Sequence, residues 1–433
     1  MPENEKLNLP GVHVAGSDCI RLAMVGCGGR GGGAIIDALS ARRGVKVVAM
    51  ADAFESRLNG TYQWVSEVVD GMEGITPTDI FDVPPERRFT GLNAHDETLE
   101  CDCDVVALCG PPGFRPRQYA AAVAAGKHVF MEKPVAVDAP GVRLCMETNR
   151  IAREKGLSVA VGHHLRHEVK HKESIARIRD GSIGELMYMR IYFDSDGIWT
   201  RGRQPGQTEM QFQVNNWYHF VWLSGDHICE QHVHDIDVAN WMADAHPIRA
   251  VGMGARMCRD PKTSEIFDYH AVEFVYPNDV RAFSFCRQIP NCWNSFSEHA
   301  HGTKGQINIE GHGDAVISID GQSPLRIERG PDGHRLEWEY FLDSLRSGTQ
   351  QFDADWATDS TMASILGRMA TYSGREVTWE DALADTTDTS PVDWSWDAEP
   401  KSLPDADGNY ATATPGITPA TSAQNRPRRR RGG

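Results

Sequence analysis

Residues 20–52 contain the feature that most constrains the fold of this chain. An apolar run at 20–25 is followed by the glycine-rich segment Gly26–Gly31, a run of small residues, and a second apolar run that ends in Asp52. This order of strand, glycine loop, helix, strand and acidic residue is typical of the first βαβ unit of a dinucleotide-binding domain. A glycine-rich turn in another kind of α/β protein is the alternative interpretation.

The glycines of this segment have separate physical roles. Gly26 permits a sharp turn off the strand, Gly28 lets a pyrophosphate approach the backbone, and Gly31 lets the helix pack close to the strand. The helix N-terminus offers free N–H groups to the phosphates. The predicted cofactor-binding residues of this segment are Gly26, Gly28, Gly29, Arg30, Gly31 and Asp52.

Asp52 indicates which dinucleotide binds. A carboxylate at the end of the second strand can accept hydrogen bonds from both adenosine ribose hydroxyls, and it would repel a 2′-phosphate. The sequence therefore predicts NAD as the cofactor, in preference to NADP.

Length and charge narrow the class of protein. A chain of 433 residues predicts two domains, and a net charge of −16 argues against nucleic-acid binding. No apolar run approaches the roughly 18 residues that a membrane span requires, so no membrane contact is predicted. The ten cysteines are interpreted as mostly buried free thiols of a reducing compartment. We expect a cytoplasmic protein, or a periplasmic one if an export signal has been removed.

The order of elements predicts four parts. Residues 1–19 form an irregular lead, and alternating strands and helices over 20–164 predict a Rossmann domain with a doubly wound parallel sheet. Residues 165–375 predict an α+β domain with an open, largely antiparallel sheet. Residues 376–433 predict an extended or disordered tail that ends in the arginine cluster Arg426–Arg431, a solvated segment or a surface for an anionic partner.

Two further loops follow predicted strands, where open α/β sheets bind cofactors. Pro111, Pro112 and Phe114 follow the strand at 104–109 and are predicted to line the cofactor. Glu132 and Lys133 follow the strand at 128–131. A lysine beside a cofactor can polarise or deprotonate a substrate hydroxyl, and the alternative is a surface lysine in a turn.

A second polar cluster lies between residues 219 and 237, with four histidines and four carboxylates. If a helix begins near His232, His234 and Asp237 share one face, and Glu230 can converge with His234. A histidine there can move a proton while a carboxylate fixes its tautomer. Two alternatives remain open: a zinc site made of His227, Glu230, His232 and His234, whose spacing matches no closed-site pattern, and a polar helix cap. No metal ligand is assigned. The predicted substrate-binding residues are Arg166, Trp217, Tyr218 and His232.

These segments resemble the Gfo/Idh/MocA family of oxidoreductases, the group of glucose–fructose oxidoreductase and inositol dehydrogenase. The resemblance rests on Gly26–Gly31, on 124–134 with its Glu-Lys-Pro motif, and on the landmarks 180–185 and 301–305; it covers about residues 20–375. It implies a Rossmann domain, a second domain whose open sheet makes homo-oligomer contacts (dimer or tetramer), and NAD(P)-linked oxidation or reduction of a sugar or polyol hydroxyl. The chain further resembles a bacterial subgroup whose substrates are mostly unassigned.

The resemblance implies roles for particular residues. Lys133 matches the family's lysine, and Glu230, His234 and Asp237 match its Asp-x-x-x-His-x-x-Asp motif, with His234 as acid/base and Lys133 as the polarising partner. Glu230 replaces the usual aspartate, and His232 stands where glycine is common. Both departures alter the predicted substrate pocket.

Three hypotheses follow. The first is an NAD-dependent dehydrogenase of a small carbohydrate, with Lys133, His234, Glu230 and Asp237 as its catalytic residues. The second is a glycoside-cleaving enzyme that uses NAD transiently in an oxidation and elimination. The third is a non-catalytic dinucleotide-binding regulator.

Overall fold

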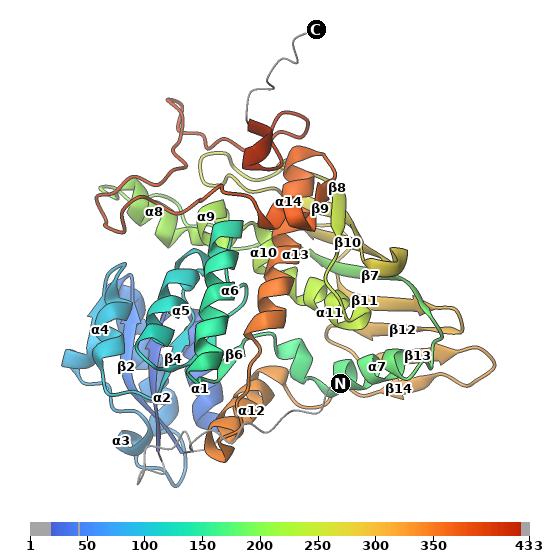
Figure 1. The fold of residues 1–433 in the computed structure, drawn as a ribbon. Helices are drawn as coiled ribbons and strands as arrows, with labels where there is room; N and C mark the ends of the chain where they lie inside the picture. The colour runs from blue at the N-terminus through green and yellow to red at the C-terminus, as the bar shows by residue number, and fades with distance from the viewer. Residues whose placement is uncertain (1–18, 42–43, 426–433) are drawn as a thin grey trace. The chain divides into compact units, whose positions relative to one another are not determined.

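The computed structural model describes residues 19–41 and 44–425, and the chain divides into two compact units, shown in Figure 1. The first unit comprises the described residues of 1–135, 144–168 and 331–357. The second comprises those of 136–143, 169–330 and 358–433.

The first unit contains a six-stranded sheet in the order β3-β2-β1-β4-β5-β6, and every pairing in it is parallel. All residues of β4 and β5 are buried, as expected of strands covered on both faces. The predicted parallel Rossmann sheet is therefore confirmed. The strands are β1 (Ile20–Val25), β2 (Val45–Asp52), β3 (Arg88–Thr90), β4 (Val105–Leu108), β5 (His128–Met131) and β6 (Val159–Val161).

Helices connect these strands, as parallel pairing requires. They are α1 (Gly29–Ser40), α2 (Glu55–Asp70), α3 (Pro77–Ile80), α4 (Ala94–Glu100), α5 (Arg115–Ala124) and α6 (Ala139–Glu154), with the short 3₁₀ turns η1 (Pro85–Arg87), η2 (Pro112–Phe114) and η3 (His164–His167).

One helix of this unit comes from a distant part of the sequence. Helix α12 (Gly333–Ser347) packs against α1 and η3, and the Trp338 ring stacks on Phe130 of β5 with centroids 4.1 Å apart. The sequence pattern predicts this helix in the second domain, because strands and helices of that domain precede and follow it. The structure places it in the first unit, where its apolar face covers β5.

The second unit contains a nine-stranded sheet in the order β14-β13-β12-β11-β7-β10-β9-β8-β15. The β7–β10 pairing is parallel and all others are antiparallel, so the predicted largely antiparallel sheet is confirmed. The strands are β7 (Leu186–Ser195), β8 (Arg249–Ala255), β9 (Tyr269–Val275), β10 (Arg281–Gln288), β11 (Ser295–Gly302), β12 (Gly305–Glu310), β13 (Ala315–Ile319), β14 (Leu325–Ile327) and β15 (Val377–Thr378).

The helices of this unit are α7 (Val169–Arg179), α8 (Glu209–Asn215), α9 (Val221–Ser224), α10 (His227–Glu230), α11 (Val233–Ala243), α13 (Ala354–Ser373) and α14 (Trp379–Leu383), with η4 (Trp217–His219), η5 (Pro277–Asp279) and η6 (Ser422–Asn425). Helix α11 packs on β7 and β11, and α7 on β12 to β14, as Figure 1 shows. The burial pattern of β7 agrees with a helix covering one face of the sheet. Met189 and Ile191 are buried, whereas the alternating residues Tyr188 and Tyr192 are partly exposed on the other face.

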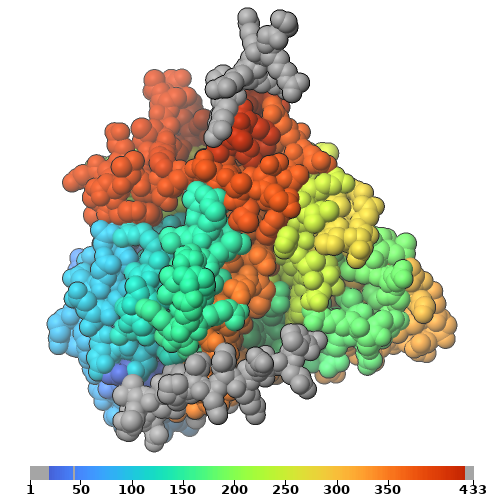
Figure 2. All heavy atoms as spheres, viewed as in Figure 1, coloured from blue at the N-terminus to red at the C-terminus, as the bar shows by residue number. Residues whose placement is uncertain are grey.

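The C-terminal residues belong to the second unit. The segment predicted as an extended or disordered tail, 376–433, begins with β15 and α14; described residues 384–421 contain no helix or strand, but they are anchored. The Tyr410 side chain is buried, and its backbone N–H donates to the Pro261 carbonyl at 2.8 Å. Figure 2 shows these red residues at the surface of the molecule in this view. The cluster Arg426–Arg431 and nearly all of the predicted N-terminal lead lie outside the described residues.

All ten cysteines are free thiols, but only five of them are buried, fewer than the predicted majority: Cys27, Cys103, Cys145, Cys229 and Cys286. Within the described residues, the structure contains no helix whose length and apolar character would allow it to cross a membrane.

Candidate active site

The glycine loop after β1 is shaped by its own backbone. Gly26 has a φ of +97°, and a Cβ there would overlap Gly110, while a Cβ at Gly31 would overlap the Gly26 carbonyl. At Gly28 and Gly29 a Cβ would meet nothing within 4 Å. Helix α1 begins there with no side-chain cap. The loop thus presents open backbone surface at uncapped N–H groups, the arrangement that binds phosphates.

Asp52 stabilises this loop through hydrogen bonds to the backbone. At the end of β2, its Oδ2 accepts a hydrogen bond from the Cys27 N–H at 2.7 Å, and its Oδ1 accepts one from the Phe54 N–H at 2.8 Å. Burial raises the pKa of Asp52 above its ordinary value. The predicted ribose-binding residue therefore also holds the glycine loop, and each carboxylate oxygen retains further acceptor capacity.

Arg30 and Glu132, both predicted to bind cofactor, form an ion pair. The Arg30 Nε donates to Glu132 Oε1 at 2.6 Å, and its Nη2 lies 3.2 Å from Asp37 Oδ2. Although burial opposes ionisation of Glu132, Arg30 and Lys133 hold its pKa below the ordinary value. The pair connects the first turn of α1 to the Glu-Lys-Pro segment after β5.

Sequence reasoning missed a third acidic residue at this place. Glu337 of α12 is buried, and its Oε1 lies 3.8 Å from Arg30 Nη2. Burial and the nearby Glu132 charge raise the pKa of Glu337 well above its ordinary value. One signal was available: Glu337 and Phe341 are four residues apart, which places the glutamate on the apolar face of the helix.

The loops after β4 and β5 are joined by Arg115, a residue outside the predicted cofactor-binding set. Arg115 is buried and donates to the carbonyl oxygens of Gly110, at 2.5 Å, and of Pro134. Pro112 and Phe114 lie buried in η2, Pro111 just before it is half-buried, and Lys133 is half-buried at the end of β5. The three predicted cofactor segments thus follow neighbouring parallel strands β1, β4 and β5.

In the second unit, the predicted acid/base residues lie on two consecutive helices. Glu230 ends α10 and is half-buried. His234 lies in the first turn of α11 and is 9% exposed. Asp237, three residues later, is buried and accepts a hydrogen bond from the Ser360 hydroxyl at 2.7 Å. The predicted helix start near His232 is close to the observed one.

The predicted substrate-binding residues are used differently. His232 is fully buried, with Nδ1 3.0 Å from Asp235 Oδ2 and Nε2 2.7 Å from Ser284 Oγ. The buried Tyr218 hydroxyl accepts from Gln288 Nε2 at 2.8 Å. Trp217 is half-buried beside the Trp199 ring. In the first unit, Arg166 lies over the Trp356 ring at 3.8 Å. His232 and Tyr218 therefore make their polar contacts within the protein.

Acidification is expected to weaken the first unit through His128. This buried imidazole accepts a hydrogen bond from the Ser158 N–H at 2.9 Å, and burial lowers its pKa to about 4. Between pH 6.5 and about 4 the unfolded chain binds a proton that the folded chain does not, so stability falls as the pH falls, by up to about 3 kcal/mol for this group. Urea unfolding across this range should show a weaker pH dependence in His128→Gln than in the exposed-site control His312→Gln. Equal slopes in the two variants would contradict the assignment.

The fold and this site define a dinucleotide-binding oxidoreductase with a Rossmann domain and an α+β domain. Residues 20–163 match the family described as the oxidoreductase family with an NAD-binding Rossmann fold, and residues 171–308 match the GFO/IDH/MocA C-terminal domain. The chain belongs to the Gfo/Idh/MocA family, and the predicted family is confirmed.

Individual relatives agree with this assignment. Inositol 2-dehydrogenase of Rhizobium meliloti is 22% identical over 341 residues, which cover 76% of this chain and 90% of the relative. A glycosyl hydrolase family 109 protein of Solibacter usitatus is 28% identical over 129 residues, covering 30% of this chain and 27% of that protein. The structure of aldose-aldose oxidoreductase from Caulobacter crescentus has a TM-score of 0.66 at 17% identity, covering 83% of this chain and 99% of that one.

Proposed function

We propose that this protein is an NAD-dependent dehydrogenase that acts on a CH–OH group of a sugar or polyol. The observation that carries the proposal is the set of predicted site segments after β1, β4 and β5, tied together by Arg30 with Glu132 and by Arg115. The substrate class is supported by the polar residues Glu230, His234 and Asp237, and by relatives named for inositol and aldoses.

The residues of the first unit fit a bound dinucleotide. Gly28 and Gly29 offer backbone surface that any side chain would cover, next to the uncapped start of α1. When bound, the nicotinamide ring would accept or return a hydride at its C4 position. We assign the pyrophosphate to Gly28–Gly31 and the adenosine ribose to Asp52. The carboxylate there favours NAD over NADP, because a 2′-phosphate would be repelled.

The remaining chemistry belongs to the protein's own side chains. Oxidation of a carbinol removes one hydride from carbon and one proton from oxygen. We assign that proton to the His234 imidazole, and stabilisation of the developing alkoxide to the Lys133 ammonium group. Asp237, held by Ser360, and Glu230 orient His234 and the substrate hydroxyls.

A spectrophotometric assay tests this function. Purified protein is incubated with NAD or NADP and a panel of inositols, aldoses and anhydro sugars, and absorbance of the reduced nicotinamide is followed. We expect net NADH formation with at least one member, and a higher kcat/KM with NAD than with NADP. The proposal fails if no panel member is turned over although NADH binds.

A second candidate is favoured by the glycosyl hydrolase family 109 relative. In this reaction NAD would be reduced and reoxidised within one cycle, with elimination of the aglycone next to a transient ketone. Release of a chromogenic aglycone without accumulation of NADH would favour this candidate over the dehydrogenase.

A further inference from the structure

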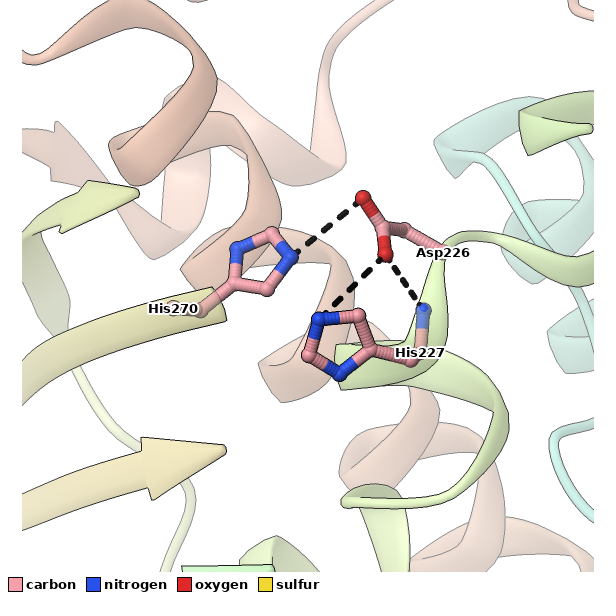
Figure 3. Close-up of side chains that lie close together, drawn as sticks. All are labelled: Asp226, His227 and His270. Carbon is pink, nitrogen blue, oxygen red and sulfur yellow. Dashed lines mark hydrogen bonds and ion pairs between the residues drawn. The ribbon is translucent and has the colours of Figure 1, made fainter. Parts of the chain in front are cut away.

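A second group of chemistry-bearing side chains lies in the second unit and takes no part in the chemistry assigned above. Asp226 precedes α10, His227 begins it, and His270 lies on β9. Figure 3 shows that their side chains point toward one another. One carboxylate oxygen and one nitrogen from each histidine all lie within 4.8 Å of one another. We propose that Asp226, His227 and His270 form a binding site for a divalent transition-metal ion, and that Zn²⁺ fits this site best.

The separation of His270 Nε2 from Asp226 Oδ2 matches that of two ligands on a small tetrahedral ion, and His227 would have to move slightly closer. His270 Nε2 lies 3.3 Å from Asp226 Oδ2, and His227 Nε2 lies 3.8 Å from Asp226 Oδ1. A tetrahedral ion with bonds of about 2.0–2.1 Å separates adjacent ligand atoms by about 3.3 Å. Two imidazoles and one carboxylate are ligand types that Zn²⁺ prefers, and a water or small anion would complete four-coordination.

Burial makes these atoms costly without a cation. Asp226, His227 and His270 are 0%, 1% and 2% exposed. Both Nε2 atoms are buried, and neither makes a hydrogen bond of normal geometry. A buried carboxylate needs a positive partner, and the ion-pair partners of Asp226 are these two histidines.

The hydrogen bonds around His270 fix its tautomer. The Thr371 hydroxyl donates to the Arg368 carbonyl at 3.0 Å, so it accepts from His270 Nδ1 at 2.8 Å. Nδ1 therefore directs its proton at Thr371, and Nε2 is left facing Asp226, where it is placed to bind a metal ion. Support of this kind behind a ligating histidine is typical of metal sites.

Asp226 is held in the same way from behind. Its Oδ2 accepts from the Phe267 N–H at 3.0 Å and from the Tyr372 hydroxyl at 2.6 Å, and its Oδ1 accepts from the His227 N–H at 2.5 Å. These donors orient the carboxylate toward the histidines. A cavity of about 250 Å³ in the same unit is lined in part by Tyr372 and Arg368. Since Tyr372 is hydrogen-bonded to Asp226, a single side chain separates this cavity from the carboxylate.

Metal analysis of the full chain tests this site. Protein prepared without a metal-affinity tag is stripped with a chelator, equilibrated with ZnCl₂ and separated from free ion. We expect about one zinc per chain in the wild type and in the control His299→Gln, whose imidazole contacts Asn308 on β12. We expect at least a tenfold lower content in His270→Gln and His227→Gln, with secondary structure checked by circular dichroism. The proposal is overturned if the wild type retains no stoichiometric zinc, or if His270→Gln retains as much as the wild type; Asp226 would then be paired with a protonated His270.

Two further measurements keep the test decisive if a ligand variant fails to fold. Co²⁺ in the wild type should give the intense visible bands of four-coordination without thiolate charge-transfer absorption, which excludes binding at a cysteine. Thr371→Val should weaken zinc binding about 10- to 100-fold, because the hydrogen bond that Thr371 accepts from His270 Nδ1 is lost. Thiolate bands, or zinc affinity unchanged in Thr371→Val, would contradict the site.

Discussion

Replacement of His234 by asparagine is expected to lower kcat about 10²- to 10⁴-fold, the usual contribution of a positioned acid/base group. His234 lies in the first turn of α11 with only 9% of its surface exposed. One turn further on, Asp237 is fixed by the Ser360 hydroxyl. Asparagine cannot accept the substrate proton, and its smaller polar side chain fits in the space of the imidazole without overpacking α11.

The measurement combines steady-state turnover with NADH binding by fluorescence. Because the cofactor segments belong to the first unit, the NADH dissociation constant should stay within about twofold of the wild type. His246→Asn is the matched control, since His246 lies just beyond α11 and stacks on Trp379. A kcat of His234→Asn within about threefold of the control would refute the acid/base assignment of His234.

Gly31→Ala is expected to destabilise the first unit by about 3 kcal/mol or more, near the upper end of the cost of overpacking. The added Cβ would overlap the Gly26 carbonyl oxygen and lie 3.4 Å from the Cys109 Cβ. The backbone atom cannot move without opening the loop that Asp52 braces. Urea unfolding of the variant and the wild type would measure the loss.

Gly28→Ala provides the contrasting variant. A Cβ at Gly28 meets nothing within 4 Å, and its φ of −80° suits any residue, so stability should change by about 1 kcal/mol or less. NADH binding should weaken at least about tenfold, because the methyl group takes the space assigned to the pyrophosphate. Equal stability losses in the two variants, or unchanged NADH affinity in Gly28→Ala, would contradict this account of the loop.

The first unit could be predicted well from the sequence because its signals are local. The turn Gly26–Gly31 lies between an apolar strand and a small-residue helix, and each buried strand is a short apolar run. The position of α12 could not be predicted, since nothing near Trp338 indicates that its partner is Phe130. In the second unit, the parallel pairing of β7 with β10 joins residues almost a hundred positions apart.

The candidate site divides in the same way. The residues at strand ends were found because parallel strands align their carboxyl ends, and Glu230, His234 and Asp237 were found from helical spacing. The hypothesised zinc set of His227, Glu230, His232 and His234 was drawn from neighbours in sequence. Among the described residues only His227 of these four joins the cluster within ligand reach. His270 lies far along the chain on strand β9, and only its inward position in the alternating pattern of that strand could have indicated it.

The origin of α12 limits how this protein can be recombined with its relatives. The cofactor-binding unit is assembled from three separate pieces of chain, and the last, 331–357, supplies Trp338 against β5 and Glu337 beside Arg30. A chimera joined at a single junction near residue 165 would pair the glycine loop with a foreign version of that piece. Exchange of cofactor preference by domain shuffling therefore requires that the residues before about 165 and residues 331–357 be transferred together.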